Sequence, residues 1–436
     1  MDKIEIVGGQ KLQGSIRISG AKNAALPLMA CALLTAEPVV LQDVPELADI
    51  RTMQKVLEHF GMKITRNGTT MTLQADNITQ FEAPYELVST MRASFWVLGP
   101  LVGRFGQARV SRPGGCAIGV RAVDRHLYVV HQLGANIDMV GGYVECQAKD
   151  GLKGTQLSFG PGTLVTPFYD TSTFKPSVGA TMNALMASVL AKGRTEIDYA
   201  AIEPEVTDLA NCLVSMGAKI SGIGTPHLVI EGVERLHGTT YAVISDRVEA
   251  STYAIAAAIT QGQLTLTNIK AELLQNVLDV LTSAGVNIHT TQDSITVSNN
   301  IWPLKPVYVT TKEYPGFPTD DQAQLMALMT LAAGESSITE TIYENRFMHV
   351  PELVRMGAHI QLKDKNTAVI KGVDRLIGAP VMASDLRASA ALILAGLAAQ
   401  GTTTVHRVYH LDRGYDNLVG KLQACGANIK RLPENN

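Results

Sequence analysis

A short signature recurs six times along the 436-residue chain, at intervals of roughly seventy residues. In each copy a glycine follows an apolar residue, and an isoleucine stands three positions after the glycine. The glycines are Gly61, Gly134, Gly217, Gly285, Gly357 and Gly426. Such a period is too long for the common solenoid repeats, but it is long enough for a unit with several strands and two helices. The sequence therefore predicts one supersecondary unit that is used six times.

The residues around each glycine predict a helix followed by a hairpin. Before the third glycine, apolar residues spaced three or four apart form one face of a helix: Val206, Leu209, Leu213 and Met216. A glycine directly after the last apolar residue is the usual left-handed helix stop. After it, apolar residues alternate with polar ones on both sides of a turn, which indicates a hairpin.

Each repeat also contains a second helix candidate, which is apolar or small on nearly every side. These candidates span residues 24–34, 93–102, 182–191, 250–260, 325–333 and 388–399. A helix without a polar face must be buried on all sides. We therefore expect three buried helices in each of two domains, with sheets outside them.

The chain length and an incomplete last repeat predict two domains and a closed chain. A chain of 436 residues exceeds the size at which one hydrophobic core stops growing. The last repeat lacks a return strand, and residues 4–14 match residues 228–238 and 368–378 in the spacing of glycine, leucine and glycine. We therefore expect residues 1–21 to supply the missing strand and to complete a domain made of residues 245–436, while residues 22–244 form the other domain.

Composition excludes several classes of protein. The formal net charge is −3, so no overall basic field points to nucleic acid or to a membrane surface. The five cysteines are scattered and form no CxxC pair, which argues against a disulfide framework and a structural zinc site. The first residues lack the features of a signal peptide, and no apolar stretch approaches the roughly twenty residues of a membrane span. We expect a cytoplasmic protein.

Charged residues stand near the start of each buried helix. They are Lys22, Arg92, Lys175, Arg247, Asp320 with Asp321, and Arg387. A cation at a helix N-terminus is unfavourable unless an anion approaches. The five cations therefore suggest a phosphate- or carboxylate-binding cleft between the domains. The alternative is that these residues mark where a buried helix reaches solvent, and Asp246 and Asp385 fit plain N-caps.

Two further segments carry candidate reactive groups. Cys116 stands in a glycine-rich run with Arg112 and Arg121 nearby, and cations lower the pKa of a thiol; an inert core cysteine is the alternative. Asp320 follows two prolines at the head of a buried helix, where it is either a general base or a helix cap. His406 and His410 lack a nearby acidic triplet, so we interpret them as structural or substrate-facing residues and not as metal ligands.

At these residues the chain resembles the enolpyruvyl transferases, and the resemblance extends from end to end. It is carried by ordered motifs at residues 20–24, 91–94, 113–116, 177–181, 317–320, 344–347, 385–389 and 412–415. The resemblance implies an α/β fold of two inside-out barrels, each made of three βαβαββ units around buried helices. It also implies an active site in the cleft between the two domains.

The resemblance further implies a reaction and its partners. The enolpyruvyl group of phosphoenolpyruvate would pass to the 3-hydroxyl of UDP-N-acetylglucosamine with release of phosphate, the first committed step of peptidoglycan synthesis. Neither a metal nor an organic cofactor would be required. The protein would be a monomer or a weak oligomer, and the inhibitor fosfomycin would alkylate Cys116.

The family's roles pass to matching positions of this chain. Cys116 would be the general acid and Asp320 the general base, with Lys22 and Arg413 assisting catalysis. Phosphoenolpyruvate would contact Lys22, Asn23, Arg121, Arg387 and Arg413. The nucleotide sugar would contact Asn23, Arg92, Arg121, Ala122, Val123, Asp124, Arg125, Lys175, Pro176, Ser177, Val178, Asp320 and Ile342.

Two alternatives stay open beside this interpretation. A shikimate-pathway enolpyruvyl transferase shares the fold and phosphoenolpyruvate, but it lacks the cysteine run that residues 113–116 carry. A noncatalytic relative that only binds a nucleotide sugar is a different class, and the retained Cys116, Asp320 and Arg413 argue against it. A phosphate-release assay discriminates among the three.

Overall fold

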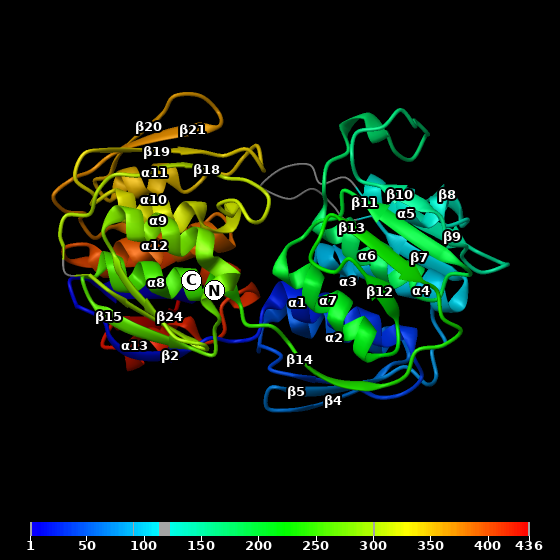
Figure 1. Cartoon of the computed structure of the whole chain (residues 1–436). Helices are drawn as coiled ribbons and strands as arrows, with labels where there is room; N and C mark the ends of the chain where they lie inside the picture. The colour runs from blue at the N-terminus through cyan, green and yellow to red at the C-terminus, as the bar shows by residue number, and fades with distance from the viewer. Residues whose placement is uncertain (1, 90, 113–122, 300, 435–436) are drawn as a thin grey trace. The chain divides into compact units, whose positions relative to one another are not determined.

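The computed structural model describes residues 2–89, 91–112, 123–299 and 301–434. The described chain forms two compact units (Figure 1). One contains residues 20–112 and 123–244 and is called the central unit; the other contains residues 2–19 and 245–434 and is called the terminal unit. Each unit has a hydrophobic core of its own, because the buried apolar residues separate into two clusters along the same boundary.

The described residues form six four-stranded sheets, three in each unit. The sheets of the central unit, in strand order, are β14 (Thr239–Ala242), β3 (Val39–Gln42), β5 (Thr70–Gln74), β4 (Lys63–Asn67); β6 (Glu82–Ala83), β7 (Gln107–Ser111), β9 (Tyr143–Gln147), β8 (Asn136–Val140); and β10 (Gln156–Ser158), β11 (Arg194–Asp198), β13 (His227–Glu231), β12 (Lys219–Ser221). Those of the terminal unit are β2 (Gln13–Arg17), β15 (Gln263–Thr267), β17 (Ser294–Ser298), β16 (Asn287–Thr290); β18 (Tyr308–Thr310), β19 (Glu335–Thr339), β21 (Thr367–Lys371), β20 (His359–Leu362); and β22 (Pro380–Met382), β23 (Thr402–His406), β1 (Asp2–Val7), β24 (Asn428–Pro433).

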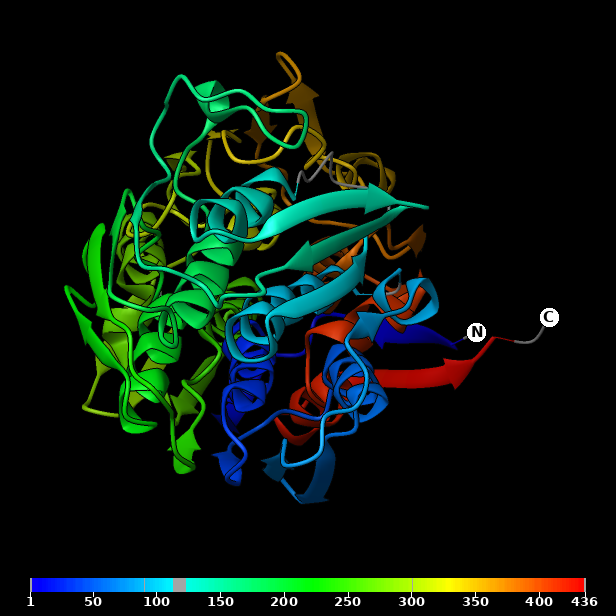
Figure 2. The same cartoon turned by 90° about the vertical axis from the view of Figure 1, so that its right-hand side faces the viewer.

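All six sheets share one pairing pattern, which confirms the sixfold repeat. In the order given, the first two strands are parallel, and the third strand is antiparallel to both the second and the fourth. The β8–β9 hairpin, cyan in Figure 2, lies on the outside of its unit.

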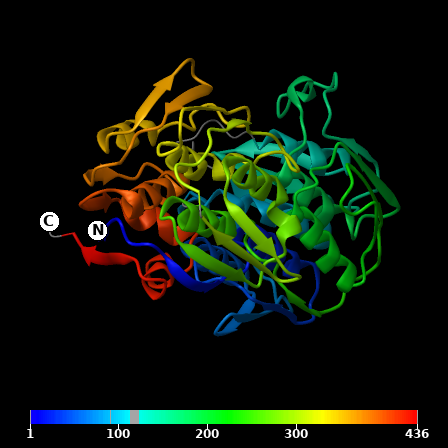
Figure 3. The ribbon, with the colours of Figure 1, turned by 60° about the vertical axis from the view of Figure 1, so that its left-hand side comes forward.

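The first strand of the chain completes the sixth sheet, as the sequence predicts. Strand β1 lies between β23 and β24, and Ile6 pairs with Thr403 on one side and Ile429 on the other. The first and last strands of the chain therefore lie side by side (Figure 3). The return strand that the last repeat lacks comes from residues 2–7.

The apolar helices are buried, as expected. In the central unit they are α1 (Lys22–Cys31) with the 3₁₀ helix η1 (Ala32–Leu34), η2 (Arg92–Val97) with α4 (Leu98–Phe105), and α6 (Val178–Ser188). In the terminal unit they are α8 (Arg247–Ile259), η5 (Thr319–Asp321) with α10 (Gln322–Met329), and α12 (Leu386–Ala398). Every residue of α10 is buried, which is the environment that a helix without a polar face requires. The helices begin a few residues earlier than expected, residues 92–97 form a 3₁₀ helix, and α6 and α10 end before residues 191 and 333.

The amphipathic helices end one or two positions before the signature glycines. These helices are α2 (Ala48–Phe60), α5 (Asp124–Gln132), α7 (Pro204–Ser215), α9 (Gln275–Ala284), α11 (Val350–Arg355) and α13 (Leu418–Ala424). All six signature glycines have positive φ, between 93° and 105°, so the predicted left-handed helix stops are confirmed. The remaining short helices are α3 (Tyr85–Val88), η3 (Thr171–Thr173), η4 (Ala271–Leu274) and η6 (Val408–Arg413).

A second set of glycines permits close backbone contact between the end of a strand and the segment after a buried helix. A Cβ atom on Gly232 would lie 1.6 Å from the carbonyl oxygen of Ala191, and one on Gly372 would lie 1.7 Å from that of Ala332. Gly8, the matching residue of the N-terminal segment, has the same close approach to Ala399. These contacts explain why the matched segments share a glycine at this position.

The architecture is mixed α/β, with buried helices and separate sheets around them. The pairing found among the described strands joins them into four-stranded sheets and does not close a barrel. In the described ranges, no helix is both long enough and apolar enough to cross a membrane.

Candidate functional site

The carboxylate of Asp320 lies between two arginines of the terminal unit. Arg346 Nη2 donates to Asp320 Oδ1 at 2.5 Å, and Arg387 Nη2 donates to Oδ2 at 3.1 Å. The two arginine side chains are only 6% and 9% exposed, whereas that of Asp320 is 31% exposed. The carboxylate is therefore fixed in orientation from the protein side and still reaches solvent.

The alternative role of Asp320 as a helix cap is wrong. The residue lies in the middle of η5, and no side chain caps either η5 or α10. Asp246 and Asp385, in contrast, are N-caps as expected. Asp246 accepts from the backbone N–H groups of Val248 and Glu249, and Asp385 accepts from those of Arg387 and Ala388.

Arg387 lies in the first turn of α12, where the Asp385 cap fixes its backbone. Burial of the guanidinium lowers its pKa, but the carboxylate of Asp320 opposes this effect and the pKa of Arg387 is raised overall. Arg387 Nη1 also donates to the hydroxyl of Tyr415 at 3.3 Å. The charge of this buried cation is therefore stabilised by Asp320 and Tyr415, which lie on other elements.

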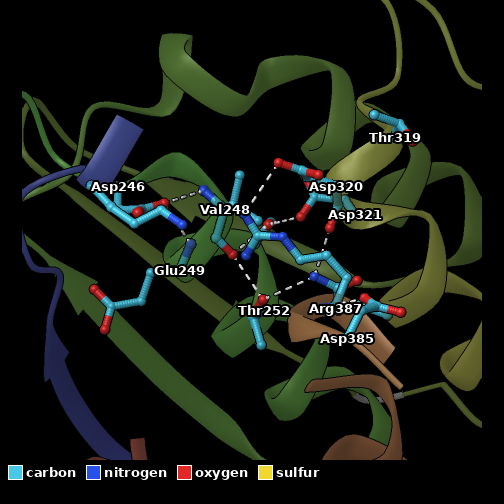
Figure 4. A network of polar contacts seen from close by, with 12 residues as sticks. Asp246, Val248, Glu249, Thr252, Thr319, Asp320, Asp321, Asp385 and Arg387 are labelled. Atoms are coloured by element: carbon cyan, nitrogen blue, oxygen red, sulfur yellow. Dashed lines mark hydrogen bonds and ion pairs between the residues drawn. The ribbon is translucent and has the colours of Figure 1, made fainter. Parts of the chain in front are cut away.

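Helices α8 and α10 and the segment after η6 supply a buried polar network behind Arg387. The hydroxyls of Thr252 and Tyr415 lie 2.9 Å apart, and Gln324 Nε2 donates to Thr252 Oγ1 at 3.3 Å. The same amide donates to the backbone carbonyl of Asp320 at 2.8 Å. Figure 4 shows Thr252, Asp320 and Arg387 gathered from three separate elements. The network connects the turn that carries Asp320 to α8 through Thr252 and to the first turn of α12 through Arg387.

Asp321 follows Asp320 but points into the core. The whole residue is only 1% exposed, and its Oδ1 accepts a hydrogen bond from the Ser251 hydroxyl. Burial raises the pKa of Asp321 to about 7, although Ser251, Arg387 and Arg247 act in the opposite direction. The two adjacent carboxyls therefore have different surroundings, and only Asp320 is accessible.

Ile342 stands in the turn after β19, where its backbone N–H donates to Glu340 Oε1 at 2.7 Å. Arg413 is the last residue of η6 and is half-buried. With Asp320 and Arg387, these residues are the predicted site residues that the structure describes in the terminal unit.

In the central unit, Lys22 begins α1 and pairs with a carboxylate that the sequence analysis missed. Lys22 Nζ donates to Asp49 Oδ2 at 3.1 Å, and Asp49 is 5% exposed. The neighbouring Asn23 is half-buried. Lys22 and Arg387 thus both have a carboxylate of the protein beside them, so neither cation depends on a bound anion for a partner.

A second group of predicted residues meets at the start of α6. Arg125 Nη2 donates to the carbonyl of Thr173 at 3.2 Å, and its guanidinium lies 5.1 Å from the centre of the Phe174 ring. Lys175 and Pro176 follow Phe174, and Ser177 caps α6 at the residue before Val178, accepting from the N–H of Ala180 at 3.5 Å. Arg125 therefore contacts the residues that directly precede the segment 175–178, although the two are far apart in sequence.

Two atoms of this group stand out among the described residues. Asp124 Oδ1 and Arg125 Nε are buried, and neither has a hydrogen-bond partner there. Val123, just before Asp124, is 6% exposed. The predictions for Cys116, Arg121 and Ala122 fall outside the described residues, as does the side chain of Arg92.

Sequence reasoning assigned no role to several residues that build these sites. They are Asp49, Glu340, Arg346 and Tyr415, of which Arg346 and Tyr415 stand within the quoted family motifs. An arginine placed inside a motif beside Glu344 and Asn345 was the one signal that could have indicated Arg346. Asp49 and Glu340 carry no such signal, because their importance comes from burial and from distant partners.

Comparison with known proteins places these features in context. A model of the EPSP synthase (3-phosphoshikimate 1-carboxyvinyltransferase) family matches residues 6–422. The UDP-N-acetylglucosamine 1-carboxyvinyltransferase of Azorhizobium caulinodans is 54% identical over 442 residues, covering 99% of this chain and 100% of the relative. The protein of that name in Rhodopseudomonas palustris is 53% identical with the same coverage.

Solved structures agree with the fold. The enolpyruvyl transferase NikO from Streptomyces tendae has a TM-score of 0.88 at 28% identity, covering 99% of this chain and 98% of that one. EPSP synthase from Acinetobacter baumannii has a TM-score of 0.76 at 16% identity, covering 99% and 100%. The second likeness concerns the fold alone.

Proposed function

Because the chain belongs to the EPSP synthase family of carboxyvinyl transferases, we propose that it transfers the enolpyruvyl group of phosphoenolpyruvate to the 3-hydroxyl of UDP-N-acetylglucosamine. Phosphate is released in the reaction, which is the committed step toward peptidoglycan. The observation that carries the proposal is the full-length identity of 53–54% to relatives named for this activity. Both relatives carry the name UDP-N-acetylglucosamine 1-carboxyvinyltransferase, which favours this substrate over shikimate 3-phosphate.

The chemistry needs an acid and a base on opposite sides of the substrate. Protonation of the phosphoenolpyruvate methylene forms a C–H bond and leaves positive character on the adjacent carbon. The sugar hydroxyl attacks that carbon as its own proton is removed. Loss of phosphate, with loss of a proton from the new methyl group, restores the double bond and gives the enolpyruvyl ether.

We assign the general base to Asp320 and the general acid to Cys116. The contacts of Asp320 support its role, because Arg346 and Arg387 orient the carboxylate while it stays 31% exposed. A base must be oriented and must also reach the proton that it removes. The assignment of Cys116 rests on the family resemblance at residues 113–116.

The cations are assigned to one substrate or the other, except Arg121, which is assigned to both. Lys22, Arg121, Arg387 and Arg413, with Asn23, bind the carboxylate and phosphate of phosphoenolpyruvate. Charge-assisted hydrogen bonds of this kind also stabilise departing phosphate. The nucleotide sugar contacts Asn23, Arg92, Arg121, Ala122, Val123, Asp124, Arg125, Lys175, Pro176, Ser177, Val178, Asp320 and Ile342. The joining of Arg125 to Phe174 supports this grouping, since it brings two of the segments together.

A phosphate-release assay tests the proposal. We expect release only when phosphoenolpyruvate and UDP-N-acetylglucosamine are both supplied, with a product heavier than the sugar nucleotide by one enolpyruvyl group. Release with shikimate 3-phosphate in place of the nucleotide sugar would refute the choice of substrate. Binding of the nucleotide sugar without any release would favour a noncatalytic relative.

A further inference from the structure

Glu340 is a buried carboxylate that contacts two parts of the candidate site at once. It follows β19 and is 2% exposed. Its Oε1 accepts from Thr311 Oγ1 at 2.9 Å and from the backbone N–H groups of Ile342 and Tyr343 at 2.7 and 3.1 Å. Its Oε2 accepts from Thr319 Oγ1 at 2.9 Å. A single carboxylate therefore satisfies four donors, which balances the cost of burying its charge.

The hydrogen bond between Glu340 Oε2 and Thr319, here called the Thr319 arm, leads to Asp320. Thr319 directly precedes Asp320 in η5, so the bond from Thr319 to Glu340 Oε2 fixes the start of the turn that carries the base. The backbone carbonyl of Thr319 lies 3.5 Å from Arg346 Nη2, which also bonds Asp320 Oδ1. Thr319 thus connects Glu340 with both members of that ion pair.

The hydrogen bond between Glu340 Oε1 and Thr311, here called the Thr311 arm, leads to Ile342. Two backbone N–H groups of this turn donate to Glu340, as described above. In addition, Thr341 N donates to Thr311 Oγ1 at 2.9 Å, and Thr341 Oγ1 donates to the carbonyl of Thr311. Thr311 Oγ1 therefore joins Glu340 to the 341–343 turn. The ring of Tyr343 lies 5.5 Å from the guanidinium carbon of Arg346, so this turn also borders the ion pair with Asp320.

We propose that Glu340 is a positioning residue, which holds the Asp320 turn through Thr319 and the Ile342 turn through Thr311 in one fixed arrangement. This inference rests on the proposed function, in which Asp320 is the base and Ile342 contacts the nucleotide sugar. Because the two carboxylate oxygens serve different partners, the arms are separable by substitution. Loss of the Thr319 arm affects the chemical step, and loss of the Thr311 arm affects binding of the nucleotide sugar.

Two threonine variants separate the arms. Thr319→Val removes the hydroxyl that bonds Oε2, and we expect kcat to fall about tenfold while KM for UDP-N-acetylglucosamine stays within about twofold. Thr311→Val removes the hydroxyl that joins Oε1 to the 341–343 turn, and we expect the reverse, with KM raised about tenfold. Thr265→Val is the matched control. The Thr265 hydroxyl contacts that of Thr296 within the β2–β15–β17–β16 sheet of the same unit, so this substitution should leave both kcat and KM unchanged.

Substitutions of Glu340 itself provide the rescue test. In Glu340→Gln the amide oxygen keeps the three contacts of Oε1, and its NH₂ group can donate to the Thr319 hydroxyl. We expect this variant to keep most of the activity, whereas Glu340→Ala loses both kcat and affinity. Equal proportional changes in kcat and KM for the two threonine variants, or no change in either, would overturn the proposal.

Hydrogen exchange keeps the inference separate from the proposed function. In the protein without substrates, Glu340→Ala should speed amide exchange in peptides that cover residues 319–321 and 341–343, and Glu340→Gln should not. Unchanged exchange in either segment would overturn the positioning role. An inactive wild-type enzyme with this exchange pattern would instead refute the proposed function and leave the positioning role supported.

Discussion

Replacing Asp321 with asparagine should remove a pH dependence of stability from the terminal unit. Burial raises the pKa of Asp321 from its ordinary value of 3.8 to about 7. The native state therefore holds this proton more tightly than the unfolded chain does. The stability that the protonated group contributes is fully present below about pH 4 and is lost as the pH rises through 7.

The size of the effect follows from the two pKa values. A carboxyl that titrates near 7 in the native state and at 3.8 in the unfolded chain loses about 2.5 kcal/mol of stability between pH 5 and pH 8. Asparagine keeps an oxygen for Ser251 but carries no titratable proton. The difference in unfolding free energy between wild type and Asp321→Asn should therefore shift by that amount across the range, in favour of the variant at pH 8.

Tryptophan fluorescence can follow this transition in one unit at a time. The chain has two tryptophans; Trp96 lies in the central unit and Trp302 in the terminal unit, where it packs against the core. In a Trp96→Phe background, urea unfolding monitored by Trp302 reports on the unit that contains Asp321. Other titrating groups, including His349, cancel in the difference between the two proteins.

Ser251→Ala provides a second measurement. The Ser251 hydroxyl lowers the pKa of Asp321, so its removal should move the loss of stability to higher pH. A difference between wild type and Asp321→Asn that stays constant within about 0.5 kcal/mol from pH 5 to pH 8 would refute the reasoning. It would mean that the Asp321 carboxyl titrates alike in the native and unfolded states.

Three further outcomes are expected. Asp320→Ala should lower kcat by at least about a hundredfold while sugar-nucleotide binding, measured by calorimetry, stays detectable; wild-type turnover would exclude it as the base. Fosfomycin should add its mass to the peptide that contains Cys116, and inactivation without that adduct would exclude the thiol as its target. Gly232→Ala should destabilise the central unit by about 3 kcal/mol in urea unfolding, because its Cβ would lie 1.6 Å from the Ala191 carbonyl; Gly103→Ala, where the nearest contact is 3.3 Å, should cost much less.

The sequence predicted the architecture well because an apolar helix and a signature glycine occur in each of the six repeats. A helix that is apolar on every side, such as residues 388–399, has few environments open to it. The left-handed conformation of Gly426 and the pairing of β1 with β24 likewise follow from local patterns. Matching residues 4–14 to residues 228–238 was sufficient to predict that the N-terminal segment completes the last sheet.

The side-chain partners within the site were much harder to predict. Asp320 and Arg346 are separated by 26 positions, and Asp320 and Arg387 by 67. Whether these side chains come into contact depends on how three elements pack, and the periodicity of the sequence does not predict that packing. The choice between base and cap for Asp320 was open for the same reason, since a capping aspartate and a paired one have the same local sequence.

The position of β1 also constrains how the protein is assembled during synthesis. As an inner strand of its sheet, β1 needs β23 and β24 as neighbours, and these are formed from residues 402–406 and 428–433. The central unit, in contrast, has all its described strands once residue 242 has emerged. Residues 2–7 therefore have no sheet partner until more than four hundred residues have been made. The terminal unit thus depends on the largest sequence separation among the described strand pairs.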